Sequence, residues 1–176
     1  LYEQLEDWPN AYSFFSYAYE LSNKDVALQN KAAYMKDKAA EFELRELKAA
    51  SEADPTNAES REKYDSMLSS RTSEQVTEAQ DRVDRNPTDP QLRYELGLAL
   101  YNAGNHSDAI PHLQQATRNP HIRTRVLLLL GKTFRAKNMH DLAVKQLTDA
   151  LADLHGMDGT KKEVLYEKGL IHLDVD

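Results

Sequence analysis

The chain has 176 residues, contains no cysteine and carries a formal net charge of -7, from 22 basic and 29 acidic side chains. The lack of cysteine excludes disulfide bridges, thiolate nucleophiles and cysteine-ligated zinc within these residues. A net negative charge disfavours nucleic-acid binding, which depends on neutralising phosphates. No stretch approaches the roughly 18 consecutive apolar residues of a membrane span. We therefore expect neither a nucleic-acid-binding protein nor a membrane segment.

Residues 1–24 are predicted to hold the end of one helix, a turn and a second helix. Apolar residues of the second helix recur at a spacing that places them on one face: Ala11, Phe15, Ala18 and Leu21. The chain begins inside this pattern without an initiator methionine, and we expect it to be a fragment of a longer protein. Its compartment therefore stays open.

Residues 25–89 are predicted to form a long helix followed by a degenerate, polar helical repeat. From Asp25 to Ala53 there is no glycine, proline or turn cluster, and apolar residues recur with helical spacing. The polar stretch after residue 54 either projects as an arm or packs as an irregular repeat. A serine- and threonine-rich run at 69–73 offers a break into two helices, because these residues favour helix ends.

A set of small and large apolar residues occurs twice between residues 90 and 152, displaced by 34 residues. The first set is Leu96, Gly97, Ala109, Leu113 and Ala116, and the second is Leu130, Gly131, Ala143, Leu147 and Ala150. A period of this length is typical of stacked repeats. Glycine inside a helix lowers the stability of that helix by about 1 kcal/mol relative to alanine. Its presence there is explained if a neighbouring helix must come close. We therefore expect Gly97 and Gly131, with the alanines Ala109 and Ala143, to mark close contacts between paired helices.

The two copies predict helix pairs over 90–123 and 124–160, and residues 161–176 begin the first helix of a truncated pair. Gly104 and Asn138 are expected to make left-handed turns between the helices of each pair. Ser107 is a candidate N-cap for the second helix, and Pro111 is expected in its first turn.

The order of Leu-Gly, alanine, a large apolar residue and alanine resembles the tetratricopeptide repeat, a helix-turn-helix unit. The resemblance implies an all-α, right-handed superhelical solenoid of antiparallel helix pairs, here with a longer helix in the N-terminal half. It also implies that the first helices of successive pairs line a concave, partner-binding face. Carried over by phase, that face contains Gln91, Tyr94, Leu98, Tyr101, Asn102, Arg125, Leu128, Lys132, Arg135, Tyr166 and Leu170.

No group of residues in the sequence indicates an enzyme. A glycine-rich phosphate loop, a His-Glu-x-x-His pair and a Gly-x-Ser-x-Gly elbow are all missing. His106 and His140 hold matching positions in the two copies, and we expect their rings to pack at the turns. Carboxylates alternate with Lys and Arg at helical spacing, which is typical of a solvated, ion-paired surface. We predict no catalytic, cofactor or metal site.

Charge is distributed unevenly along the chain. Residues 1–89 carry 11 basic and 19 acidic residues, a net of -8, whereas 90–176 carry 11 and 10, a net of +1. Aromatic residues beside Arg and Lys suit an acidic peptide, although a merely solvated basic surface is an equal alternative. We predict a non-enzymatic scaffold for protein or peptide partners. The alternatives are a regulatory or substrate-recruiting region of a larger enzyme, and an assembly module that self-associates through its truncated end or long helices.

Overall fold

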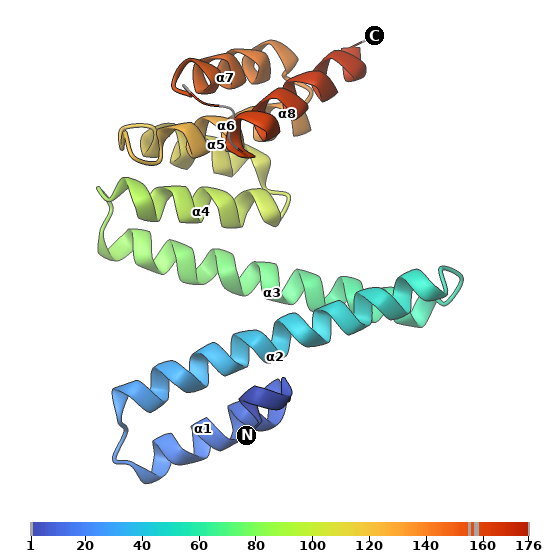
Figure 1. Ribbon diagram of the computed structural model, residues 1–176, viewed down its shortest axis with the longest axis vertical. Helices are drawn as coiled ribbons and strands as arrows, with labels where there is room; N and C mark the ends of the chain where they lie inside the picture. The colour runs from blue at the N-terminus through green and yellow to red at the C-terminus, as the bar shows by residue number, and fades with distance from the viewer. Residues whose placement is uncertain (1, 155, 157–158, 176) are drawn as a thin grey trace. The chain divides into compact units, whose positions relative to one another are not determined.

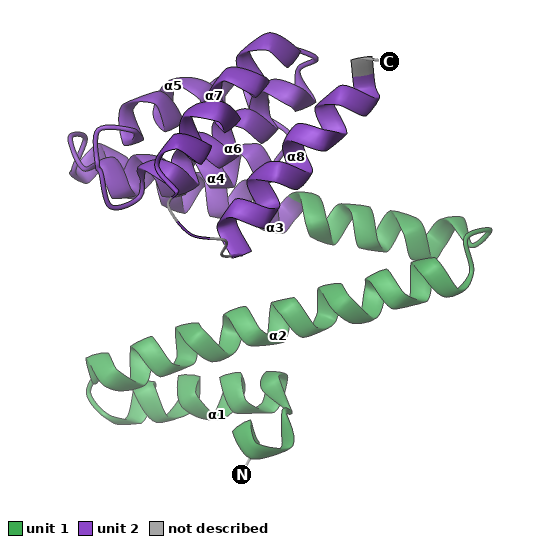
Figure 2. Cartoon of the chain, turned by 45° about the horizontal axis from the view of Figure 1, so that its top comes forward, with its two compact units in different colours: residues 1–69 green, residues 70–176 purple. Residues whose placement is uncertain are grey.

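The computed structural model describes residues 2–154, 156 and 159–175, and it confirms the all-α prediction (Figure 1). Over these residues the chain forms eight α-helices and one short 3-10 helix, with no strand. It divides into two compact units, residues 1–69 and 70–176, coloured separately in Figure 2. Each unit is described by itself below. Among the helices described, none is both long and apolar enough to cross a membrane.

The first unit is built around a hairpin of α1 (Trp8–Leu21) and α2 (Val26–Ala53), preceded by a 3-10 helix, η1 (Glu3–Leu5). The long helix predicted from Asp25 to Ala53 is thus confirmed as α2. Asp25 caps it, since its carboxylate accepts a hydrogen bond of 2.7 Å from the amide of Ala27. The core of this unit is small, because its buried apolar residues are Ala11, Ala32 and Met35.

Helix α3 (Ala58–Arg85) runs without a break through residues 69–73. The alternative that this run divides the stretch into two helices is therefore wrong. Serine and threonine cost only a few tenths of a kcal/mol more than good helix formers, roughly 0.5 each. Their hydroxyls can also bond back to the preceding turn, as Thr77 Oγ1 does to the carbonyl of Ser73 at 3.0 Å.

The second unit continues from the end of α3 with α4 (Pro90–Asn102), α5 (His106–Ala116), α6 (Arg123–Ala136), α7 (His140–Ala152) and α8 (Gly159–Val175). Helix α4 packs on α5, and α6 packs on α7, so each predicted pair is a hairpin. The hairpins stack, because α5 contacts α6 and α7 contacts α8. The first helices α4, α6 and α8 are also successive neighbours, which places them along one side of the unit.

Leucines at matching positions form the centre of this stack. Leu96, Leu113, Leu130 and Leu147 are all essentially inaccessible to solvent. The predicted close contacts at the two glycines are present, with one difference. The side chain over each glycine is the buried leucine of the next helix rather than an alanine. The alanines of the pattern are fully buried beside those leucines.

The turns inside the hairpins match the sequence prediction, but two details of α5 do not. Gly104 and Asn138 have φ angles of 77° and 57°, as expected for left-handed turns. Asn105, not Ser107, occupies the N-cap position, and the Ser107 hydroxyl instead accepts a hydrogen bond of 2.5 Å from Lys137. Pro111 lies inside the helix rather than in its first turn, so α5 lacks one amide donor there.

Candidate partner-binding face

The residues predicted to bind a partner fall on three helices, α4, α6 and α8. Helix α4 carries Gln91, Tyr94, Leu98, Tyr101 and Asn102; α6 carries Arg125, Leu128, Lys132 and Arg135; α8 carries Tyr166 and Leu170. The structure brings most of the α4 and α6 residues together at two clefts. Asn102 and Tyr166 line neither cleft and are exposed.

The first cleft, here called the α4–α6 cleft, has a volume of about 290 Å³. Its lining comes from all three first helices: Tyr94, Leu98, Arg125, Leu128, Leu129, Lys132, Thr160 and Glu163. Leu128 and Leu129 are buried and form an apolar floor, whereas Arg125 is exposed. Among the described residues, Arg125 has no ion pair or hydrogen bond from its side chain. The cleft thus combines an apolar pocket with an available cation, an arrangement that suits an apolar side chain next to a carboxylate.

The second cleft, of about 230 Å³, is more polar. It is lined by Tyr101, Lys132, Arg135, Ala136, Asn138, Glu167 and Asp174. Both cations of this cleft are already paired with carboxylates of α8, as described next. The second cleft therefore offers a partner less free charge than the first.

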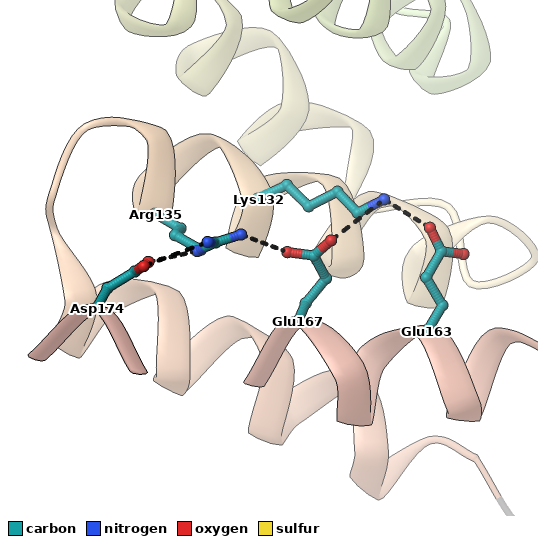
Figure 3. A network of polar contacts seen from close by, with 5 residues as sticks. All are labelled: Lys132, Arg135, Glu163, Glu167 and Asp174. Atoms are coloured by element: carbon teal, nitrogen blue, oxygen red, sulfur yellow. Dashed lines mark hydrogen bonds and ion pairs between the residues drawn. The ribbon is translucent and has the colours of Figure 1, made fainter. Parts of the chain in front are cut away.

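An ion-pair network joins α6 to α8 (Figure 3). Lys132 Nζ lies 2.5 Å from Glu163 Oε1 and 3.8 Å from Glu167 Oε1. Arg135 Nη1 lies 3.4 Å from Glu167 Oε2, and Arg135 Nε lies 2.6 Å from Asp174 Oδ2. Glu167 stands between the two cations, and its side chain is only 13% exposed. It is therefore the least solvated carboxylate of the network.

The network changes the proton affinities of its members. Burial acts to lower the pKa of Lys132, but the hydrogen bond and charge of Glu163, with the charge of Glu167, outweigh it and raise that pKa. The hydrogen bond between Arg135 and Asp174 raises the pKa of Arg135 and lowers that of Asp174. Both of these cations therefore face carboxylates of α8. Lys132 and Arg135 are thus not the free cations that the sequence analysis expected at an acidic binding site.

The pairing of these α8 carboxylates with Lys132 and Arg135 was not predicted from the sequence. A signal was present, because Glu163, Glu167 and Asp174 follow one another at intervals of four and seven residues and so share a helix face. Lys132 and Arg135, three residues apart, share a face of α6 in the same way. Which faces meet depends on how α8 packs against α6, and no local spacing reports that.

Among the described histidines, His106 and His112 contact neighbouring side chains, whereas His121 and His172 are exposed. The ring of His106 lies 5.2 Å from that of Tyr101, which matches the expected packing at the turn. His112 Nδ1 lies 3.3 Å from Arg93 Nη1, and burial together with the charge of Arg93 lowers the pKa of His112. Within the described part of the chain, no three His, Asp or Glu side chains are placed to hold a metal ion.

Residues 69–125, from within α3 to the first turn of α6, match the sequence model of the tetratricopeptide repeat. A comparison with curated proteins found no match. Among solved structures, the chain is similar to a human IFIT1 dimer with m7Gppp-AAAA, at 17% sequence identity and a TM-score of 0.45. The alignment covers 98% of this chain and 43% of that chain, so this chain spans less than half of its length. This likeness is weak, because the TM-score is below 0.5.

Proposed function

We propose that the chain, whose residues 69–125 match the tetratricopeptide-repeat model, is a non-enzymatic scaffold that binds a segment of another protein on the face formed by α4, α6 and α8. Stacked hairpins expose an extended surface to which each first helix contributes side chains. The proposal holds equally if the chain is a regulatory or substrate-recruiting region of a larger enzyme, since the binding surface is the same.

The observation that carries this proposal is the α4–α6 cleft. The apolar part of its lining includes Tyr94 and Leu98 of α4 and the buried Leu128 of α6. The exposed Arg125 also lines the cleft. Aromatic residues, arginines and desolvated pockets are the features that concentrate binding energy at protein interfaces. Residues from three helices converge there, so the cleft is a property of the stack rather than of one hairpin.

The charges favour a partner with one apolar anchor and one carboxylate. Arg125 is available for an incoming carboxylate, whereas Lys132 and Arg135 already face Glu163, Glu167 and Asp174. A strongly acidic partner would gain little from those two cations, because their charge is largely cancelled. The sequence predicted an acidic peptide as the partner. We now propose a partner that needs only one carboxylate, which would pair with Arg125.

The proposal is tested by selecting peptides from a display library against residues 1–176 and measuring their dissociation constants by fluorescence anisotropy. We expect Arg125→Glu and Leu98→Arg each to weaken the selected peptide by roughly tenfold or more, the equivalent of about 1.4 kcal/mol. Arg118→Glu is the matched control, since Arg118 is also exposed but does not line the cleft. Equal losses with Arg118→Glu would indicate nonspecific charge attraction, and unchanged binding by Arg125→Glu would reject the cleft as the site. Circular dichroism of each variant verifies that the fold is retained.

A further inference from the structure

The α4–α6 cleft carries charges of both signs at separate places. Its charged lining residues are Arg125, Lys132 and Glu163. Arg125 and Lys132 are seven residues apart on α6, so they share a helix face and are separated by roughly 10.5 Å along the helix axis. Glu163 Oε1 lies 2.5 Å from Lys132 Nζ, which places this carboxylate beside Lys132. Arg125 thus marks one end of the cleft, and Glu163 marks the other.

At the Glu163 end, the carboxylate is more accessible to solvent than the cation. The side chain of Lys132 is 23% exposed, whereas that of Glu163 is 48% exposed. Lys132 Nζ also lies 3.8 Å from Glu167 Oε1, so it faces two carboxylates (Figure 3). The group that this end presents to an incoming molecule is therefore chiefly the carboxylate of Glu163.

The ion-pair network between α6 and α8 has one negative formal charge in excess. It joins two cations, Lys132 and Arg135, to three carboxylates, those of Glu163, Glu167 and Asp174. Glu163 is the most exposed of the three, since Glu167 is 13% and Asp174 38% exposed. Neither Glu167 nor Asp174 lines the α4–α6 cleft. The excess negative charge is thus accessible in this cleft at Glu163.

The lining between the two ends is apolar. Leu128 and Leu129 lie between Arg125 and Lys132 along α6, and both leucines are buried. The cleft therefore presents a cation, an apolar floor and a carboxylate in that order.

The cleft is also distinct from the places where the second helix of a hairpin packs. Those places are marked by Gly97 and Gly131, against which Leu113 and Leu147 lie. Neither glycine lines the cleft. The cleft is thus not the missing half of a hairpin contact.

We propose that the α4–α6 cleft selects a partner segment in which an apolar anchor has an acidic residue on one side and a basic residue on the other. The acidic residue pairs with Arg125 and the basic residue with Glu163. Glu163 is then the residue that rejects a segment with acidic residues on both sides, because like charges would meet there. This inference rests on the proposed function, which by itself requires only the anchor and one carboxylate.

The separation of the two charges also sets the spacing and direction of the segment. Three residues of an extended chain span roughly 10 Å, which matches the separation along α6. We therefore expect the acidic and basic residues to be about three positions apart. A segment bound in the reverse direction would bring its acidic residue to Glu163, so the charges favour one direction of binding.

The test repeats the peptide selection with the wild type, Glu163→Lys and the matched control Glu62→Lys. Glu62 is exposed and does not line the cleft. The wild type and Glu62→Lys should enrich peptides with opposite charges on the two sides of the anchor, whereas Glu163→Lys should enrich peptides with acidic residues on both sides. Glu163→Gln removes the charge without placing a second cation beside Lys132. It should abolish the preference for a basic residue, and it serves as the test if Glu163→Lys does not fold.

Dissociation constants measured by fluorescence anisotropy complete the test. In a peptide selected by the wild type, replacing the basic residue with glutamate should weaken binding to the wild type about fivefold, a modest factor because exposed ion pairs contribute little. The same replacement should strengthen binding to Glu163→Lys. Circular dichroism verifies that each variant retains its fold.

Two results would overturn this inference alone. One is a set of wild-type peptides that Arg125→Glu weakens but that carry acidic residues on both sides of the anchor. The other is selection by Glu163→Lys of the same charge pattern as the wild type. In both cases the cleft still binds a partner, and the proposed function stands. Peptides that Arg125→Glu does not weaken would instead reject the cleft itself, and with it both proposals.

Discussion

Leu113 lies against Gly97 so closely that any side chain on Gly97 would have to displace it, since an added Cβ atom would be 2.5 Å from Leu113 Cδ2. The same relationship joins Leu147 to Gly131. Real Cβ contacts are not this short, and the two leucines are fully buried with closely packed neighbours. The glycines are thus required by side-chain packing between helices, although each lowers the intrinsic stability of its own helix.

Gly97→Ala is therefore expected to destabilise the second unit, although alanine is the better helix former. Overpacking of this kind costs about 1–3 kcal/mol, which exceeds the gain of about 1 kcal/mol in helix propensity. Gly169→Ala is the matched control, because it makes the same chemical change in a helix where the added atom meets open space. It should stabilise α8 by about 0.5–1 kcal/mol.

Urea unfolding followed by circular dichroism measures both effects. The two variants should shift the unfolding midpoint in opposite directions, downward for Gly97→Ala and upward for Gly169→Ala. An unchanged or raised midpoint for Gly97→Ala would mean that Leu113 can move aside at little cost, and the packing argument would then be wrong.

The network between α6 and α8 leads to a second prediction, that Glu167→Gln loosens α8. Glu167 faces both Lys132 and Arg135, and its side chain is only 13% exposed. Removing its charge leaves two cations with less compensation, at an expected cost of about 1 kcal/mol after allowance for solvent screening. Hydrogen exchange measures this effect. We expect the amides of α8 to exchange faster in the variant, and those of α4 and α5 to exchange at unchanged rates.

Glu163→Gln is the control for this change, since among the described residues Glu163 forms an ion pair with Lys132 alone and its side chain is 48% exposed. Exposed ion pairs contribute roughly 0–1 kcal/mol, so its effect should be less than half as large. The difference between the two variants should also shrink in 1 M salt, where the Debye length is about 3 Å. Equal effects of Glu163→Gln and Glu167→Gln would show that the burial of Glu167 does not strengthen its contribution to the stability of α8.

The helix pairs were predictable because the residues that specify them are close together in the sequence. A glycine in the first helix and a leucine 16 residues later, as with Gly97 and Leu113, are part of a pattern that repeats after 34 residues. The first predicted pair begins at residue 90, where α4 begins, and the second begins one residue earlier than expected, at Arg123. Local periodicity, turn residues and small side chains were sufficient for this part of the fold.

The candidate site was less predictable, because its electrostatics depend on contacts between different hairpins. Arg125 and Lys132 look alike in the sequence, as cations on the same helix. In the structure Lys132 pairs with Glu163 and Glu167, whereas Arg125 has no such partner among the described residues. The distinction arises from where α8 crosses α6, which depends on packing. The Ser107 prediction was wrong because α5 begins at His106, which places Ser107 inside the first turn, where its hydroxyl accepts a hydrogen bond from Lys137 of the next hairpin.

A third prediction concerns His112, whose Nδ1 lies 3.3 Å from Arg93 Nη1 and accepts a hydrogen bond from it. Burial, together with the charge of Arg93, lowers the pKa of His112 below its ordinary value. The unfolded chain then binds this proton more readily than the folded protein, so His112 makes the protein less stable as the pH falls below about 6.5. Above that pH the imidazole is neutral in both states, and the effect vanishes.

His112→Gln removes the titrating group while its side-chain oxygen can still accept from Arg93. Unfolding free energies measured between pH 8 and pH 5 should show the variant losing less stability than the wild type on acidification. His121→Gln is the control, because His121 is exposed. A wild type and His112→Gln variant with parallel pH profiles would contradict the assignment of this histidine as the sensitive group.

The fourth prediction contrasts the two units by their cores. Among its described apolar residues, the first unit buries only Ala11, Ala32 and Met35, whereas the single helix α6 buries the whole run from Val126 to Leu130. Amide protection follows buried contacts, so amides of α1 and α2 should exchange at least tenfold faster than those of α6 once intrinsic rates are corrected. Met35→Ala, which empties a fully buried position at a cost of about 2–5 kcal/mol, should abolish protection in α1 and α2 while that of α6 persists. Loss of protection in α6 by the same factor would show instead that the two units unfold as one.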